Sequence, residues 1–346
     1  MLIYRITKCF SKQFQRKVIL MPGDGIGPEI TEATVRIIDT LKLPIEWEHH
    51  KIHSKAVTKE GDLIDEKTIK GIQECGFGLK GPFETPIGKG HRSLNLTLRK
   101  KLKLYANLRP CITINGVKGL LYDNINLVTI RENTEGEYSG LEHQVAPGII
   151  ENLKIITEKA CEDVCRFAFE YAKKYGRKKV TCAHKADVMK LSDGCFLRVA
   201  QKIAKEYPDI IYEEKQVDSI CTRLINHPEN LDVMVMPNLY GDILSDLCAG
   251  LVGGLGMTPS GNIGFDCSVY EAVHGTAPDI AGKGVANPTA LLLSSAMMLE
   301  HMNFIKEGLQ IRNAVTSVIG EGKWITRDLG GKASTKEYTD AIINAL

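Results

Sequence analysis

The stretch KVILMPGDGIGPEITEATVRIIDTL, residues 17–41, decides the fold class. Its first five residues form a short apolar run with β-branched members, which predicts a buried strand. A glycine-rich turn follows at 22–28. Pro28 suits the first helical position and Glu29 suits the positive start of a helix, so we predict a helix from there to about Leu41.

The same order of strand, turn and helix recurs along the chain. Further apolar runs stand at 76–80 (GFGLK), 126–133 (NLVTIREN), 178–185 (KKVTCAHK) and 231–238 (LDVMVMPN). Strands that alternate with helices indicate an α/β chain with a largely parallel sheet. No Ser/Pro-rich linker interrupts the sequence, so any two domains must be intimately joined.

The glycine-rich turn does not match the dinucleotide-binding fingerprint of a Rossmann domain. Its spacing is Gly23-x-Gly25-x-Gly27 rather than G-x-G-x-x-G. No acid ends a second strand about 20 residues later, as that fingerprint requires. Two interpretations of the turn therefore stay open, a structural turn and a ligand-binding loop.

The composition describes an ordinary globular protein. The 346 residues suit two medium-sized domains or one large α/β unit, and 43% are hydrophobic while 25% are charged. The net charge of +2, with no basic stripe outside the N-terminus, gives no indication of a nucleic-acid partner. No apolar run approaches the ~20 residues of a transmembrane helix. The ten cysteines include no CxxC pair, which argues against zinc and fits a reducing compartment.

Residues 1–17 differ from the rest of the chain. They hold five basic residues and no acid, and Ile3, Ile6, Phe10 and Phe14 recur at spacings of three and four. A helix here would be apolar on one side and basic on the other, which is typical of a mitochondrial transit peptide. We therefore expect import into the mitochondrial matrix; the alternative is a short basic tail.

The segment NLYGDILSDLCAGLVGGLG, residues 238–256, contains two acids four residues apart. Asp242 and Asp246 lie at a predicted helix start, so their carboxylates share one face. Close carboxylates repel each other unless a cation lies between them, and Mg²⁺ prefers such oxygens. The alternative is a pair of solvated acids on a surface helix.

A second group of residues suits a substrate with several carboxylates. In RSLNLTLRKKLKLYANLRP, leucines spaced by four predict a core-facing helix, with Asn95 and Arg99 on another face and Ser93 near its start. Arg109 follows at the predicted helix exit, and Arg131 ends the apolar strand NLVTI. Guanidinium groups bind carboxylates through two parallel hydrogen bonds. The alternative is that the three arginines lie on the surface.

Two further residues could transfer protons. Tyr138 lies in the polar glycine loop ENTEGEYSG, and Lys185 ends the strand KVTCAH. A metal ion and neighbouring groups can lower the pKa values of a tyrosine and a lysine until they exchange protons at neutral pH. Either side chain could instead be structural.

The segment EAVHGTAPDIAGKGVANP, residues 271–288, places glycines around His274 and Asp279. Gly275 allows a close approach between backbone and cofactor. An acid such as Asp279 can accept a hydrogen bond from a ribose 2′-hydroxyl and repels a 2′-phosphate, so it favours NAD over NADP. The alternative is a surface loop with an Asx turn.

These segments, in this order, resemble the isocitrate/isopropylmalate dehydrogenase family of β-decarboxylating dehydrogenases, from about Lys17 to Leu346. Within that family the chain is most similar to the catalytic-type subunits of mitochondrial NAD-dependent isocitrate dehydrogenases. The resemblance implies oxidative decarboxylation of isocitrate to 2-oxoglutarate and CO₂ with NAD and Mg²⁺ or Mn²⁺, a reaction of the tricarboxylic acid cycle.

The resemblance also implies a two-domain α/β fold distinct from a Rossmann domain. Residues 18–107 and 253–346 would form the large domain with the NAD loop. Residues 108–252 would form the small domain. A clasp at about 138–160 would join two subunits of a homo- or hetero-oligomer, which would share their active sites.

The substrate roles follow by matching motifs. The resemblance implies that Ser93 and Asn95 contact the γ-carboxylate of isocitrate. Arg99, Arg109 and Arg131 would bind its other carboxylates.

The metal and proton-transfer roles follow in the same way. Asp242 and Asp246 would hold the metal together with Asp218 of the partner subunit. Lys185 of the partner subunit would accept the hydroxyl proton. Tyr138 would protonate the carbon from which CO₂ departs.

The resemblance implies that NAD is bound by one residue near position 85 and by the loop that follows Glu271. The implied contacts are Thr85, Glu271, His274, Gly275, Thr276, Ala277, Asp279, Ile280 and Asn287.

Three alternatives remain open at this point. An isopropylmalate dehydrogenase would need apolar residues where Ser93 and Asn95 stand. A homoisocitrate dehydrogenase is a second alternative. A non-catalytic regulatory subunit is the third, although such subunits commonly lose metal-binding acids that this chain keeps.

Overall fold

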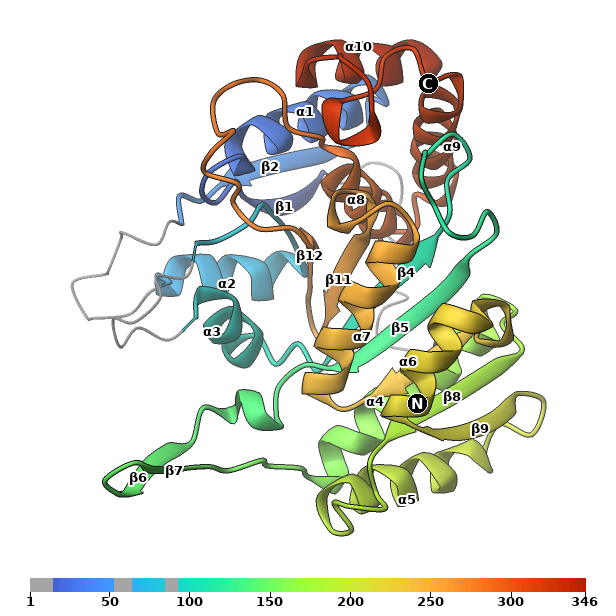
Figure 1. The fold of residues 1–346 in the computed structure, drawn as a ribbon. Coiled ribbons are helices and arrows are strands. Elements are labelled where there is room, and N and C mark those ends of the chain that lie inside the picture. The colour runs from blue at the N-terminus through green and yellow to red at the C-terminus, as the bar shows by residue number, and fades with distance from the viewer. Residues whose placement is uncertain (1–14, 53–63, 85–92) are drawn as a thin grey trace.

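The computed structural model describes residues 15–52, 64–84 and 93–346, and its centre is one ten-stranded sheet (Figure 1). Thr85 and most of the expected transit peptide lie outside the described residues. In spatial order the strands are β2 (Ile45–His49), β1 (Arg16–Met21), β3 (Phe77–Lys80), β12 (Ser268–Ala272), β11 (Pro259–Ile263), β4 (Ala106–Ile112), β5 (Asn126–Glu132), β10 (Val233–Met236), β8 (Lys179–His184) and β9 (Ile211–Gln216).

The sheet is parallel toward both edges and antiparallel at its centre. Strands β2, β1, β3 and β12 pair in parallel, as do β5, β10, β8 and β9. The pairs β12–β11, β11–β4 and β4–β5 are antiparallel. The prediction of a largely parallel α/β sheet is confirmed, and the central antiparallel strands join its two parallel parts.

The sheet crosses the expected division into two domains without interruption. The expected boundary near 108 falls inside β4, and the boundary near 252 falls at the end of α7 (Asn238–Leu251). The other helices are α1 (Gly27–Thr40), α2 (Glu66–Cys75), α3 (Leu94–Lys101), α4 (Glu158–Lys174), α5 (Ser192–Ala204), α6 (Val217–Asn226), α8 (Thr289–His301), α9 (Ile305–Glu321) and α10 (Thr335–Ala345).

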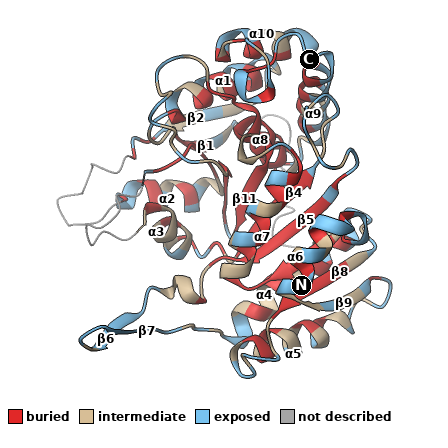
Figure 2. Ribbon diagram, in the orientation of Figure 1, coloured by how far each residue is buried: buried red, intermediate tan, exposed pale blue. Residues whose placement is uncertain are grey.

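Burial follows this arrangement, with the central strands and α8 forming the interior (Figure 2). Helix α8 is buried along nearly its whole length because it packs on β11 and β12 on one side and on α1 and α9 on the other. Helix α4 packs on β5, β8 and β10, while α6 and α7 pack mainly on β5, β8, β9 and β10. The strand and helix predicted at 17–41 are confirmed as β1 and α1.

The glycine-rich turn between β1 and α1 is required by close packing. Gly25 has φ +59°, and a Cβ atom there would lie 2.0 Å from the carbonyl oxygen of Thr276. The backbone N–H of Ile26 donates to that same oxygen at 2.9 Å, and Asp24 N–H donates to the oxygen of Pro82 at 2.8 Å. The turn therefore holds the loops at 82–84 and 274–287 beside each other, which is a structural role.

A hairpin of β6 (Glu142–Ala146) and β7 (Ile149–Asn152) projects from the body of the molecule (Figure 1). Its two strands pair only with each other, and several of its large apolar side chains are exposed, Ile150 by 70%. No helix in the described part of the chain could cross a membrane.

Candidate active site

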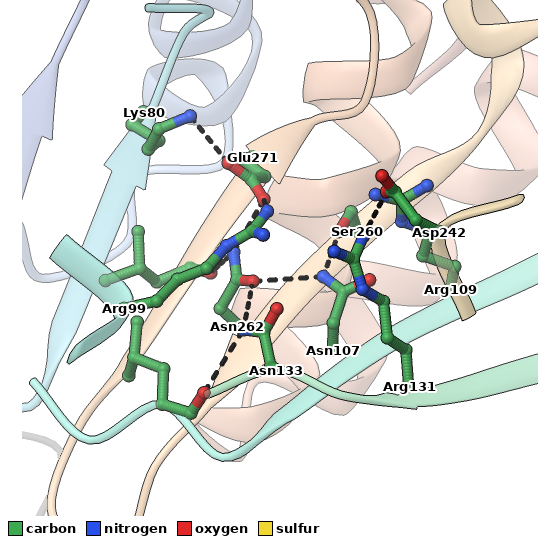
Figure 3. Close-up of polar contacts among 12 residues, drawn as sticks. Lys80, Arg99, Asn107, Arg109, Arg131, Asn133, Asp242, Ser260, Asn262 and Glu271 are labelled. Atoms are coloured by element: carbon green, nitrogen blue, oxygen red, sulfur yellow. Dashed lines mark hydrogen bonds and ion pairs between the residues drawn. The ribbon is translucent and has the colours of Figure 1, made fainter. Parts of the chain in front are cut away.

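Arg131 is the centre of the candidate site. It lies near the end of β5, only 1% exposed, and donates from Nε and Nη2 to Asn238 Oδ1 at 2.9 and 2.7 Å. Its Nη1 pairs with a carboxylate oxygen of Asp242, one turn further along α7. Burial, together with the positive charges of Arg99 and Arg109, lowers the pKa of Arg131 to about 10. Arg99 and Arg109 thus lie close enough to act on the charge of Arg131; Figure 3 shows Arg109 and Arg131 beside Asp242, and Arg99 beside Glu271.

A glycine allows this contact between β5 and α7. A Cβ atom at Gly241 would lie 2.4 Å from Cγ and 2.5 Å from Cβ of Arg131. The local sequence contains no signal for this role, although Gly241 directly precedes Asp242. The role depends on a strand more than a hundred residues away.

Arg109 forms the second pair of the site. Its Nη1 donates to Ser245 Oγ at 2.7 Å and to Asp246 Oδ1 at 2.8 Å, while its Nε is buried without a hydrogen-bond partner. The prediction that Arg109 stands at a helix exit is wrong. Helix α3 ends at Lys101, and Arg109 lies within β4, because Lys103 takes a left-handed backbone (φ 51°) that turns the chain. The alternative that the three arginines lie on the surface is likewise wrong for Arg109 and Arg131.

Tyr138 joins the same cluster from the short helix η2 (Glu137–Ser139). Its hydroxyl donates to the second carboxylate oxygen of Asp242, and Arg131 lies over its ring at 5.1 Å. Burial and the adjacent Asp242 raise the pKa of Tyr138. The lowering expected from the sequence depends on a bound metal ion, so it stays a prediction. Burial opposes the ionisation of Asp242, but Arg131 and the Tyr138 hydroxyl outweigh it, so the pKa of Asp242 is lowered.

Lys185 and Asp218 form a separate cluster. Lys185 follows β8 directly, and its Nζ lies 2.9 Å from Asp218 Oδ1 in the first turn of α6. The hydrogen bond from Lys185 lowers the pKa of Asp218, and the same bond raises the pKa of Lys185. Among the described residues, no three metal-binding side chains meet at one point. Asp242 and Asp246 both lie on α7, whereas Asp218 of the same chain lies on α6.

Arg99 of α3 is held by a buried polar network (Figure 3). Its Nη2 lies 3.2 Å from Glu271 Oε1 on β12, while Lys80 Nζ lies 2.6 Å from Glu271 Oε2. Asn262 donates to Glu271 Oε1 at 2.7 Å. Burial opposes the ionisation of Glu271, but Lys80 and Arg99 outweigh it and hold its pKa well below the usual range.

Lys80, Asn262 and the amides that support them were not among the residues predicted from the sequence. Asn107 and Asn133 each donate to Asn262 Oδ1 at 3.0 Å. Of these residues, only Lys80 could have been recognised from the sequence, because it is a lysine at the end of an apolar strand. Ser93 stands at the start of α3, and the Oδ1 atom of Asn95 is buried without a hydrogen-bond partner among the described residues.

The loop at 274–287 is fixed from several sides. Glu29 of α1 accepts from the N–H groups of Gly284 (3.4 Å) and Ala286 (3.1 Å), and Asn287 donates to Asp328 at 2.8 Å. His274 Nδ1 contacts the oxygen of Gly275, and burial lowers the pKa of His274. Its Nε2 atom is buried and has no hydrogen-bond partner in the described part of the chain. Asp279 is exposed. The remaining predicted contacts of this loop are Thr276, Ala277 and Ile280, which are half-buried.

Comparisons with known proteins show which family this chain is similar to. The family model of isocitrate/isopropylmalate dehydrogenases matches residues 17–342. The chain is 55% identical to "Isocitrate dehydrogenase [NAD] catalytic subunit 5, mitochondrial" of Arabidopsis thaliana, over 94% of this chain and 87% of that protein. It is 54% identical to a mitochondrial protein of Dictyostelium discoideum that is named a regulatory subunit of NAD-dependent isocitrate dehydrogenase, over 96% and 92%. The crystal structure of isocitrate dehydrogenase from Methylococcus capsulatus superposes with a TM-score of 0.91 at 44% identity, over 95% of this chain and 99% of that one.

Proposed function

The chain belongs to the isocitrate/isopropylmalate dehydrogenase family, and on that premise we propose that it catalyses NAD-dependent oxidative decarboxylation of isocitrate to 2-oxoglutarate and CO₂. It is a mitochondrial enzyme and one subunit of an oligomer, as the names of its relatives indicate.

The observation that carries the proposal is the convergence of three arginines beside two acids. Arg99, Arg109 and Arg131 are all largely buried, and each is paired with a carboxylate of this chain. Guanidinium groups match carboxylates in geometry and charge, so isocitrate, with three carboxylates, suits this set of cations. Ser93 and Asn95 at the start of α3 would contact the γ-carboxylate, and Asn95 Oδ1 has no partner within the described chain.

A divalent metal ion fits the two acids of α7. Asp242 and Asp246 present hard oxygen ligands from one helix face, one turn apart. We propose that Asp218 of the partner subunit completes the set, with Mg²⁺ or Mn²⁺ as the ion. When bound, the ion polarises the oxygen at carbon 2 of the substrate and stabilises the negative charge that develops as CO₂ departs.

The chain's own residues move the protons. Tyr138 keeps its phenolic proton at neutral pH, because burial and Asp242 raise its pKa, and it is therefore suited to protonate the carbon that loses CO₂. Lys185 of the partner subunit would accept the hydroxyl proton during oxidation. Its ion pair with Asp218 favours the charged form, so it must be released from that pair to act as a base.

NAD would bind at the loops held together by the glycine-rich turn. Glu271, Asn287 and the segment from His274 to Ile280 supply the expected contacts, together with Thr85 outside the described residues. The unpartnered Nε2 atom of His274 is available to a ligand. The exposed carboxylate of Asp279 suits a ribose 2′-hydroxyl and repels a 2′-phosphate.

The domain division and the dimer clasp are part of the same proposal. Residues 18–107 and 253–346 would form the large domain and residues 108–252 the small domain, with the single sheet running through both. The exposed apolar side chains of the β6–β7 hairpin support its assignment to an interface between subunits near 138–160.

The metal-binding acids and Tyr138 argue against the alternative that the chain is a non-catalytic regulatory subunit. One relative of 54% identity is named a regulatory subunit, so overall similarity does not separate the two types. The chain keeps Tyr138 and Arg131 in contact with Asp242, and Arg109 in contact with Asp246. This supports a catalytic subunit.

Substrate choice tests the proposal. Turnover with isocitrate should exceed that with isopropylmalate at least about tenfold, which corresponds to about 1.4 kcal/mol of discrimination. The polar side chains of Ser93 and Asn95 are the reason, since an isopropyl group would leave them unpaired. NADH formation with each substrate measures it. Equal or faster turnover of isopropylmalate or homoisocitrate would overturn the assignment.

A further inference from the structure

A buried ammonium group lies between the Tyr138 cluster and the Lys185 cluster. Lys154 stands in the connection between β7 and α4, with a side chain only 13% exposed. Its Nζ lies 2.6 Å from Asp193 Oδ1 and 3.3 Å from Glu137 Oε1, and 4.8 Å above the ring of Tyr240. None of these contacts belongs to the roles described above.

One of these contacts leads to Lys185. Asp193, in the first turn of α5, is fully buried, and its Oδ2 accepts the backbone N–H of Lys185 at 2.7 Å. Among the described residues, Lys154 is the one cation in ion-pair contact with Asp193. A buried carboxylate depends strongly on such a partner, so the ion pair with Lys154 holds the Asp193 side chain in place.

The other contact leads to Tyr138. Glu137 precedes Tyr138 in η2, and within residues 15–52, 64–84 and 93–346 its second carboxylate oxygen is buried without a partner. Lys154 supplies the charged contact of its other oxygen. Tyr240 lies on α7 two residues before Asp242, so the ring that Lys154 covers belongs to the helix that carries the two acids. The Lys154 ammonium group thus contacts Glu137, which precedes Tyr138, and Asp193, which accepts the backbone N–H of Lys185.

We propose that Lys154 is a positioning residue that fixes the backbone of Lys185 and the segment of Tyr138 together. The inference rests on the proposed function, in which Tyr138 serves the chain's own active site and Lys185 serves the partner's. One ammonium group would therefore set the geometry of both sites of a dimer.

Replacement of Lys154 by Met tests this role, because Met keeps most of the side-chain length and removes the charge. We expect kcat to fall at least tenfold while the KM for isocitrate changes less than twofold, since Lys154 contacts none of the three arginines. Lys154→Arg should lie much closer to wild type. Lys336→Met, which changes a lysine 78% exposed on α10, is the matched control and should leave both constants unchanged. A kcat for Lys154→Met within twofold of this control would overturn the proposal.

A second variant separates positioning from folding. Lys154→Met combined with Asp193→Asn removes the unpaired charge at position 193, and Asn can still accept from Lys185 N–H. This double variant should unfold near the wild-type temperature. Its kcat should nevertheless stay at least fivefold below that of wild type, because no side chain then links Glu137 to position 193. Recovery of wild-type kcat in the double variant would show that only the buried charge mattered and would overturn the proposal.

Hybrid dimers, isolated through two different tags, test the tie between sites. A dimer of one wild-type and one Lys185→Met chain carries a lesion in one site and should keep about half the activity. A dimer of one wild-type and one Lys154→Met chain carries a lesion in each site and should keep well under half. If both hybrids keep half, Lys154 does not act on two sites. If the Lys185→Met hybrid itself departs from half, the shared site of the proposed function fails, and the tie between sites fails with it.

Discussion

Gly241→Ala gives a prediction whose sign depends on one contact. In an exposed helix, Ala is more favourable than Gly by about 1 kcal/mol. At Gly241, however, the new Cβ would lie 2.4 Å from Arg131 Cγ, whereas carbon atoms pack at about 3.5–4.0 Å. Arg131 must therefore move by more than about 1 Å, which would break its hydrogen bonds of 2.9 and 2.7 Å to Asn238.

The expected magnitude follows from these terms. Overpacking costs about 1–3 kcal/mol, and hydrogen bonds of a charged group contribute about 1.5–3 kcal/mol, against the gain of about 1 kcal/mol from propensity. We expect a net loss of at least about 2 kcal/mol in the free energy of unfolding, measured by urea denaturation. The KM for isocitrate should rise at least tenfold, because Arg131 is displaced.

Gly250→Ala is the matched control in the same helix. A Cβ at Gly250 meets no atom within 4 Å, so this variant should gain up to about 1 kcal/mol or stay unchanged. If Gly241→Ala is as stable as Gly250→Ala and binds isocitrate as tightly as wild type, the reasoning about the contact between β5 and α7 is refuted.

Three other perturbations probe the cofactor, the shared site and pH. Asp279→Lys should narrow the preference for NAD over NADP by roughly tenfold, since it replaces repulsion of a 2′-phosphate by attraction; an unchanged ratio of kcat/KM values would contradict this. Asp242→Asn and Asp218→Asn should each nearly abolish turnover. When the two variants are mixed and subunit exchange is confirmed, activity should partly return, because one of the two sites in each mixed dimer carries no substitution. If activity does not return, Asp218 does not act across the interface. Burial lowers the pKa of His301 to about 4 from 6.5, so the unfolded chain binds this proton first and stability falls as pH drops from 6.5 to 4. At pH 4.5 the free energy of unfolding lost through His301 should be about 2–3 kcal/mol. Urea denaturation at pH 7.5 and 4.5 measures this loss: the difference between the two pH values should be smaller in His301→Asn than in wild type by that amount.

Local patterns predicted most of the elements that carry the site. The apolar run and glycine turn at 17–28 predicted β1 and the start of α1, and the spacing of Asp242 and Asp246 predicted one shared helix face. These features depend on neighbours in sequence. Motifs in a fixed order then indicated the family, which the comparisons confirm.

What sequence reasoning missed depends on contacts between distant segments. The role of Gly241 depends on Arg131, and that of Lys80 on Glu271, 191 residues away. The apolar spacing of α3 continues beyond the end of the helix to Tyr105, so the sequence does not show where the helix ends. The sequence therefore predicts Arg109 at a helix exit, whereas it lies in β4. Spacing cannot reveal a left-handed turn at Lys103.

Product analysis tests the central claim most directly. The purified chain, supplied with isocitrate, NAD and Mg²⁺, should form NADH, 2-oxoglutarate and CO₂ in equal amounts, and chelation of the metal or Asp242→Asn should stop all three together. NADH formed from isocitrate without release of CO₂, or turnover that persists in Asp242→Asn, would contradict the account.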